Sequence, residues 1–186
     1  MTNENARPKH SGKPRRPHGG KPHPGRGPKP GSNHRRHRDE PEEKFIRRAI
    51  PDIDTPFTRM GIDARVAINL PGLGIETPSP IQEKSIPGIV EGRDLLGLAQ
   101  TGTGKTAAFG LPMLTRLLNI GRKPEPRTCR ALILAPTREL ATQIAEEIRV
   151  LARFTDLKLT TIFGGVPVAR QARALRGRPE IIVGCP

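Results

Sequence analysis

The 186-residue chain contains no tryptophan, no tyrosine and only two cysteines. Cys129 and Cys185 form no C-x-x-C pair and have no neighbouring histidine, which argues against a disulfide framework and a structural zinc site. The chain also lacks a run of 18 apolar residues and the apolar core of a secretory signal, which excludes a membrane-spanning helix by pattern. We therefore predict a cytoplasmic protein with reduced cysteines and no membrane partner.

Acidic residues are scarce at the amino terminus. Residues 1–38 contain 11 lysines and arginines against the single acid Glu4, a net charge of +10 within a total of +14. All five histidines lie in the same segment, and no aromatic residue precedes Phe45. With almost nothing apolar to bury, residues 1–44 are predicted to form a disordered basic tail.

The tail has two interpretations. It is either an electrostatic arm for nucleic-acid phosphate or a solubilising extension, and the lack of aromatic residues excludes base stacking. Metal binding by histidines such as His34 and His37 is disfavoured, because disordered polar tracts rarely fix a coordination geometry.

From residue 45 onward, apolar runs of strand length alternate with segments of helical period. This alternation predicts βαβ units, and hence an α/β fold with a parallel sheet covered by helices on both faces. In the helix expected at residues 137–152, one face is predicted to carry Leu140, Ile144, Ile148 and Leu151. The expected strands are 93–99, 130–135, 158–163 and 180–185, and the expected helices are 105–118, 137–152 and 168–175.

The stretch AQTGTGKT, residues 99–106, differs by one residue from the phosphate-loop pattern G-x-x-x-x-G-K-[ST]. Gly102 and Gly104 permit positive φ angles, so that backbone N–H groups can surround an anion. Lys105 can reach the β and γ phosphates, and the Thr106 hydroxyl can bind Mg²⁺. The alternative is a glycine-rich turn that binds nothing. A strand before and a helix after favour the phosphate loop.

The upstream stretch GIETPSPIQ, residues 74–82, contains a candidate residue for recognition of the nucleotide base, Gln82. A glutamine side chain donates and accepts together, which suits the N6 and N7 atoms of adenine, and Phe57 is an aromatic ring that can cover a base. The Asn-Lys-x-Asp pattern expected of a guanine site is absent. On its own, Gln82 is an ordinary helix residue that follows the Ser79 cap and Pro80.

Four motifs in this order resemble the DEAD-box RNA helicases over residues 55–186. The stretch 55–83 with Phe57 resembles the Q motif, 99–106 resembles motif I, and PTRELA at 136–141 resembles motif Ia. Gly164 and Gly165 are similar to the glycine pair that follows. The resemblance implies an ATP-dependent RNA helicase with RecA-like domains, whose cofactors are ATP and Mg²⁺ and whose partner is RNA. Residues 45–186 would be part of the first domain.

The resemblance also implies roles for individual residues. Phe57 would stack on adenine, Gln82 would hydrogen-bond to it, and Lys105 and Thr106 would serve catalysis. Thr137, Arg138 and Gly165 would hold the RNA backbone, although Arg138 has the simpler interpretation of a solvated charge. The residues expected to contact ATP are Phe57, Gln82, Ala99, Gln100, Thr101, Gly102, Thr103, Gly104, Lys105 and Thr106.

The sequence departs from the family pattern at its carboxyl end. Cys185 replaces the threonine of motif Ib, which is cut after Pro186, and the Asp-Glu-Ala-Asp box does not appear in the chain. Without that acid nothing positions Mg²⁺ and the attacking water, so we expect an inactive and aggregation-prone fragment. The main alternative is a non-catalytic nucleic-acid-binding protein that acts through its tail. A kinase or GTPase with a phosphate loop is disfavoured by Phe57 and Gln82.

Overall fold

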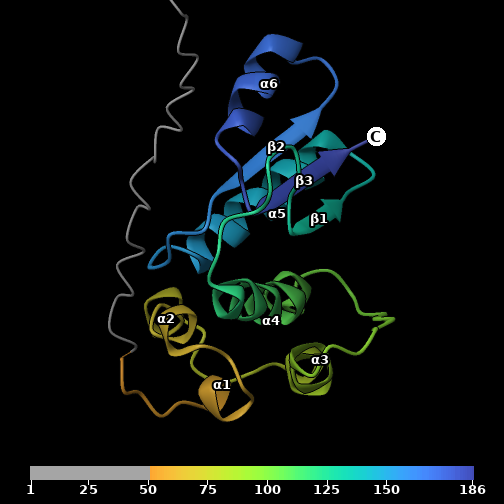
Figure 1. The fold of residues 1–186 in the computed structure, drawn as a ribbon. Helices are drawn as coiled ribbons and strands as arrows, with labels where there is room; N and C mark the ends of the chain where they lie inside the picture. The colour runs from red at the N-terminus through yellow and green to blue at the C-terminus, as the bar shows by residue number, and fades with distance from the viewer. Residues whose placement is uncertain (1–50) are drawn as a thin grey trace, which may run out of the picture. The chain divides into compact units, whose positions relative to one another are not determined.

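The computed structural model describes residues 51–186 (Figure 1). The predicted tail, residues 1–44, lies outside the described residues, as do residues 45–50. In the described part, Cys129 and Cys185 are unpaired and partly exposed. No helix between residues 51 and 186 combines the length and the apolar character needed to cross a membrane.

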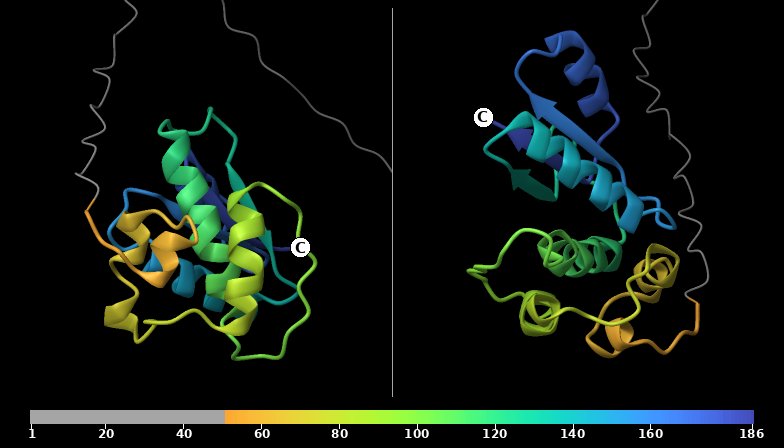
Figure 2. Two further views of the ribbon diagram at one scale, coloured as in Figure 1. Left: turned by 90° about the horizontal axis from the view of Figure 1, so that it is seen from below. Right: turned by 180° about the vertical axis from the view of Figure 1, so that it is seen from behind.

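Helices dominate the first half of the described chain. In Figure 1, α4 lies between the preceding helices and the sheet, and Figure 2 shows α3 and α4 side by side. The elements before the sheet are α1 (Pro56–Arg59), α2 (Ala64–Ala67), the 3₁₀ helix η1 (Pro71–Leu73), α3 (Pro80–Val90) and α4 (Lys105–Ile120).

Helix α4 confirms the helix expected at 105–118 and extends it by two residues. It begins after Gly104 and ends at Gly121, and both glycines have positive φ angles of 85° and 66°. A glycine in this conformation after the last turn is a common helix stop. The helix continues through the buried Pro112, because Pro112 removes only one backbone donor from the middle of a long, packed helix.

The sheet has three parallel strands in the order β1-β3-β2. Val183 of β3 is paired with Ile133 of β1 on one side and with Thr161 of β2 on the other. The prediction of a parallel α/β fold is therefore confirmed. The remaining elements are β1 (Ala131–Leu134), α5 (Arg138–Leu151), β2 (Leu159–Phe163), α6 (Val168–Arg176) and β3 (Ile181–Cys185).

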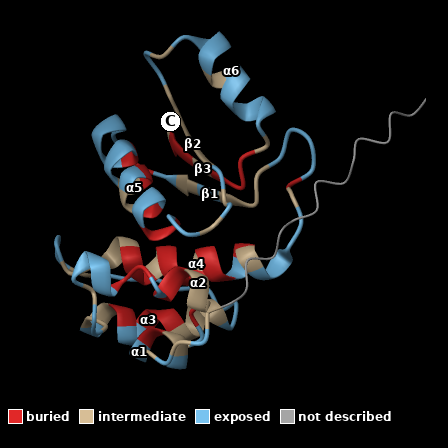
Figure 3. Ribbon diagram, turned by 90° about the vertical axis from the view of Figure 1, so that its left-hand side faces the viewer, coloured by how far each residue is buried: buried red, intermediate tan, exposed pale blue. Residues whose placement is uncertain are grey.

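The core lies on both sides of α4, against α5 and the sheet on one side and against α1, α2 and α3 on the other, and buried residues lie on both sides in Figure 3. Ile148 of α5 and Ile181 and Val183 of β3 are fully buried. The predicted helical face was partly wrong, because Leu140 is 38% exposed whereas Ala141 and Ala145 are buried. Ile148 and Leu151 are buried as predicted, and the small side chains of Ala141 and Ala145 let α5 approach its neighbours closely, which shifts the buried face away from Leu140.

The strand expected at residues 93–99 does not form, so that prediction was wrong for this structure. The segment is irregular, and in Figure 2 it runs outside α3 and α4. Leu96 and Leu98 are 90% and 89% exposed. A strand is stabilised by its partners, and among residues 51–186 no strand pairs with this segment. Leu132 and Leu134 of β1 point to the same face of the sheet, and both side chains are also exposed.

Candidate nucleotide and RNA site

The phosphate loop leads directly into the amino end of α4. Gly102 and Gly104 have φ angles of 78° and 85°, as the sequence predicts. Gly104 offers no side-chain cap, and the first backbone bond of this end runs from Ala108 N to the Gly104 carbonyl at 3.0 Å. The amides before Ala108 therefore remain available to an anion, and the helix dipole favours one there. A Cβ at Gly102 would meet no atom within 4 Å. These features fit a nucleotide phosphate.

The Lys105 ammonium is occupied by the loop itself. Its Nζ donates to the Ala99 carbonyl at 2.7 Å and also to the Gln100 carbonyl. Thr103 Oγ1 donates to the same Gln100 carbonyl at 2.9 Å, which closes the turn. Lys105 thus holds the loop in a compact form, and a bound phosphate has to replace these carbonyls as the acceptor.

Helix α3 is joined to the phosphate loop by two side chains at its amino end. Gln82 is 4% exposed, and its Oε1 accepts from Ser79 N at 3.0 Å while its Nε2 donates to the Gly104 carbonyl at 3.2 Å. Ser79 Oγ donates to the Thr103 carbonyl at 2.9 Å. A Cβ at Gly104 would lie 2.5 Å from Gln82 Nε2, so this contact requires glycine. Gln82 therefore lies in the first turn of α3 after the Ser79 cap, and it also contacts the phosphate loop.

Phe57 does not face solvent. Its side chain is 1% exposed and belongs to the hydrophobic core with Val66 and Ile86. The preceding Thr55 caps α1, which fixes the turn that carries the ring. Stacking of Phe57 on an adenine requires α1 to move away from this core.

The residues expected to hold RNA meet at the carboxyl ends of β1 and β2. Thr137 caps α5, accepting from Leu140 N at 3.2 Å, and Arg138 is the first residue of the helix. A Cβ at Gly165, where φ is 82°, would lie 2.6 Å from Arg138 Nη1. The Arg138 guanidinium therefore lies directly over the glycine pair, 27 positions further along the chain. All three residues are exposed.

No group of three or more histidine, cysteine or acidic side chains in residues 51–186 is arranged to hold a metal ion. Thr106, the residue expected to bind Mg²⁺, is the second residue of α4, and its side chain is half-buried. A hydroxyl supplies one ligand, so Mg²⁺ bound here would take its other ligands from phosphate oxygens and water.

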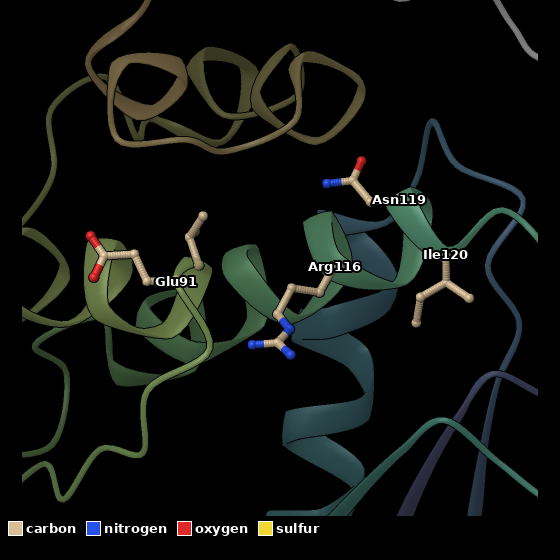
Figure 4. A pocket seen from close by; sticks show the side chains of 5 residues that line it. Glu91, Arg116, Asn119 and Ile120 are labelled. Carbon is tan, nitrogen blue, oxygen red and sulfur yellow. The ribbon is translucent and has the colours of Figure 1, made fainter.

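A separate shallow pocket of about 380 Å³ lies at the other end of α4 (Figure 4). It is lined by Val90, Glu91, Arg116, Asn119 and Ile120. Arg116 donates to the Ile89 carbonyl at 3.2 Å, and Glu91 pairs with Arg93 at 2.8 Å. Since a helix rises about 1.5 Å per residue, this pocket is roughly 20 Å from Lys105 along α4 and is not the phosphate site.

Sequence reasoning missed three contacts of this region. The tether from Lys105 to Ala99 and the bond from Ser79 to Thr103 depend on the loop conformation, which spacing alone does not reveal. The third is Gln171, whose Nε2 and Oε1 bind the backbone of Phe163 and fix α6 beside β2. The pattern Ser-x-x-Gln at 79–82 was a usable signal for the start of α3, because it is typical of a capping box.

Comparison with known proteins agrees with the geometry. The family model described as DEAD/DEAH box helicase matches residues 79–186. The ATP-dependent RNA helicase CshA of Listeria monocytogenes is 44% identical over 132 residues, which are 71% of this chain and 24% of that protein. The chain thus spans about a quarter of the length of this curated relative.

Two solved structures support the same relationship. A DEAD box protein from Methanococcus jannaschii is 33% identical with a TM-score of 0.61, and the alignment covers 71% of this chain and 35% of that one. The RNA helicase Prp28 from Chaetomium thermophilum, bound to ADP, is 40% identical with a TM-score of 0.61 over 74% and 34% of the two chains. Because the family model covers more than half of the sequence, the chain belongs to the DEAD/DEAH box helicase family, within its RNA helicases.

Proposed function

We propose that a protein containing this chain is an ATP-dependent RNA helicase, in which residues 51–186 bind ATP and part of the RNA. The observation that carries the proposal is the pair of bonds made by Gln82. One side chain caps α3 and contacts the phosphate loop, which supports a direct coupling between the residue proposed to recognise the base and the loop proposed to bind phosphate. The relatives are named as RNA helicases, and one of them was solved with ADP.

In this proposal the chain's own residues bind and orient the nucleotide. Lys105 moves from the Ala99 carbonyl to the β and γ phosphates, the α4 amides bind a phosphate oxygen, and the Thr106 hydroxyl would be one ligand of Mg²⁺. Gln82 exchanges its bonds to Ser79 N and the Gly104 carbonyl for bonds to the adenine edge, and Phe57 covers the ring once α1 has moved. Bound Mg²⁺ would neutralise the phosphate charge during phosphoryl transfer.

The RNA part of the proposal rests on Thr137, Arg138 and Gly165. Their positions at the carboxyl ends of β1 and β2, the two strands that flank β3, form a surface suited to a phosphate backbone, because an exposed guanidinium lies next to open backbone. Such contacts carry no sequence information, which suits an enzyme that acts on many sequences. The basic tail, residues 1–44, would add a further electrostatic contribution through the net charge of +10 in residues 1–38.

The test compares nucleotides and residues separately. Binding of ATP, GTP and ADP to the 186-residue chain is measured by calorimetry, and RNA-stimulated ATP hydrolysis is measured for the longer protein. We expect a preference for ATP over GTP, and loss of hydrolysis in Lys105→Ala with retention of low-salt RNA binding. Equal affinity for GTP would contradict the role of Gln82. Salt-sensitive RNA binding without any nucleotide binding would instead favour the non-catalytic alternative.

A further inference from the structure

Helix α6 has no buried residue, which sets it apart from α5 and α4 (Figure 3). A nine-residue helix is too short to be stable by propensity alone. Its attachment is Gln171, whose Oε1 accepts from Phe163 N at 3.0 Å and whose Nε2 donates to the carbonyls of Phe163 and Val166, both at 3.2 Å. These bonds turn the Gln171 side of α6 toward β2 and leave the rest of the helix open to solvent.

Three arginines occupy the opposite side of α6. Arg170, Arg173 and Arg176 recur every third residue and are exposed. At about 100° per residue they span an arc of roughly 120°, centred about 160° away from Gln171. We call these three side chains the arginine face. It points away from the sheet by the same geometry that holds Gln171 against it.

The charge of the arginine face is not neutralised by neighbouring acids. Residues 157–179 contain no aspartate or glutamate, and in the described chain none of the three arginines takes part in an ion pair. Arg178 provides a contrast, because its guanidinium donates to the Pro124 carbonyl at 2.9 Å and so has a structural role. Three exposed guanidinium groups that form no ion pair within residues 51–186 favour a polyanion.

The arginine face continues the surface formed by Arg138 and Gly165. Helix α6 begins three residues after Gly165, and Arg170 is in its first turn. Because α6 starts so close to Gly165, a strand of nucleic acid that contacts Arg138 and Gly165 can continue along Arg170, Arg173 and Arg176. Val168 and Leu175 are exposed at the same helix, but they lie on the Gln171 side and not among the arginines.

We propose that the arginine face of α6 binds the RNA phosphate backbone and lengthens the RNA path beyond Arg138 and Gly165. The inference rests on the proposed function, because it extends the same RNA. Binding is independent of sequence, since α6 offers no aromatic ring for stacking, and the amide of Gln171 is engaged by the backbone. The occupant is single-stranded RNA, which this surface contacts through its phosphates.

The test uses the 186-residue chain and a fluorescein-labelled oligouridine, with affinity measured by anisotropy over a series of KCl concentrations. The triple variant Arg170→Gln, Arg173→Gln, Arg176→Gln is compared with the unmutated chain. Each phosphate contact on single-stranded RNA contributes about 0.7 to the slope of log affinity against log salt, so we expect the slope to fall by about 2. Far-ultraviolet circular dichroism verifies that the variant keeps its helices.

A matched control removes the same charge elsewhere. The variant Arg122→Gln, Arg127→Gln, Arg149→Gln alters three exposed arginines outside α6, and we expect its slope to change by less than about 0.7. A photo-crosslink from 4-thiouridine RNA, mapped by mass spectrometry, should fall on residues 164–178 in the unmutated chain and in this control.

Equal slopes for the two triple variants, or crosslinks confined to other segments, would overturn the inference while leaving the proposed function intact. Loss of binding to anionic lipid vesicles with unchanged RNA binding would also overturn it and assign α6 to a membrane surface. If the unmutated chain bound no RNA at low salt, the RNA part of the proposed function would fail together with this inference.

Discussion

The Lys105 Nζ atom lies 2.7 Å from the carbonyl oxygen of Ala99, six residues earlier in the chain. The lysine expected to bind phosphate therefore donates hydrogen bonds to carbonyls of its own loop in this structure. Nucleotide binding is an exchange, in which phosphate oxygens replace the carbonyls of Ala99 and Gln100. A charge-assisted bond of this kind contributes about 1.5–3 kcal/mol, which the incoming phosphate must exceed.

Replacing Lys105 should separate nucleotide binding from RNA binding. We expect Lys105→Met to weaken ADP binding by at least about tenfold, because a charge-assisted contact worth about 1.5 kcal/mol or more is lost. Binding is measured by calorimetry on the 186-residue chain. Lys84→Met, at an exposed position of α3, is the control and should bind ADP as the unmutated chain does. Equal weakening in both variants would contradict a specific role for Lys105.

Two substitutions at Gln82 should distinguish its roles. Gln82→Glu keeps an acceptor for Ser79 N and places a negative charge at a helix amino end, so we expect α3 to retain its stability. The carboxylate cannot donate to the Gly104 carbonyl, so ATP binding should fall. Gln82→Ala loses both bonds and should lower the free energy of unfolding by roughly 1–3 kcal/mol.

Urea unfolding and ATP titration of the two variants make the comparison. If Gln82→Glu bound ATP normally, the bond to Gly104 would have no part in nucleotide binding. If Gln82→Ala were as stable as Gln82→Glu, the cap at Ser79 would contribute nothing measurable.

Gly165→Ala should weaken RNA binding beyond what its loss of folding stability explains. The new Cβ would lie 2.6 Å from Arg138 Nη1, so the guanidinium must shift from the glycine pair. The positive φ of 82° adds a strain of about 1–2 kcal/mol. Gly121→Ala is the control, because its φ is 66° and its Cβ would meet no atom within 4 Å. Anisotropy should show weaker RNA binding only for Gly165→Ala, while urea unfolding shows similar losses for both.

The local elements were predictable from sequence because their signals are local. The pattern Ser79-Pro80-x-Gln82 indicates the start of α3, and glycines with a following lysine indicate the start of α4. The orientation of α5 was not predictable, since leucines and alanines both recur at helical spacing. A Cβ at Gly110 of α4 would lie 2.6 Å from Ile148 Cδ1, so close packing between α4 and α5 decides which face is buried.

The non-local features were beyond the sequence signal. Residues 93–99 have the apolar character of a strand, but a strand exists only with a partner, and local composition cannot say whether one is present. The contact of Arg138 with Gly165 joins two segments through the register of β1, β3 and β2. Only the resemblance to DEAD-box helicases placed these two residues in one site before the structure was known.

Acid should selectively weaken the amino end of α2. Arg65 donates to the Asp63 carboxylate with Nη2 at 2.7 Å, and this hydrogen bond holds the pKa of Asp63 below its usual 3.8. A carboxyl whose pKa is lowered by folding stabilises the protein above its unfolded pKa, and this contribution is lost as the pH falls. The difference in unfolding free energy between the unmutated chain and Asp63→Asn should therefore shrink from about pH 5 downward.

The matched control for this prediction is Asp54→Asn. Asp54 also pairs with an arginine, Arg59 at 2.6 Å, but both side chains are exposed. Solvent screens such a pair, so its removal should change stability little at any pH. Urea unfolding at about pH 6, 5, 4 and 3, followed by circular dichroism, compares the three proteins. A constant difference between the unmutated chain and Asp63→Asn across this range would contradict the assignment.

The irregular segment 93–99 should make the 186-residue chain self-associate. Leu96 and Leu98 are 90% and 89% exposed, and in the described residues their backbone has no partner strand. Open backbone donors next to exposed leucines are a template for pairing with a second copy.

Sedimentation velocity should show species larger than a monomer that increase with concentration. The double variant Leu96→Lys, Leu98→Lys should shift the distribution toward monomer. A control at Leu175→Lys, which is exposed on α6, should leave the distribution unchanged. If the unmutated chain stayed monomeric at high concentration, residues 93–99 would not be a site of self-association.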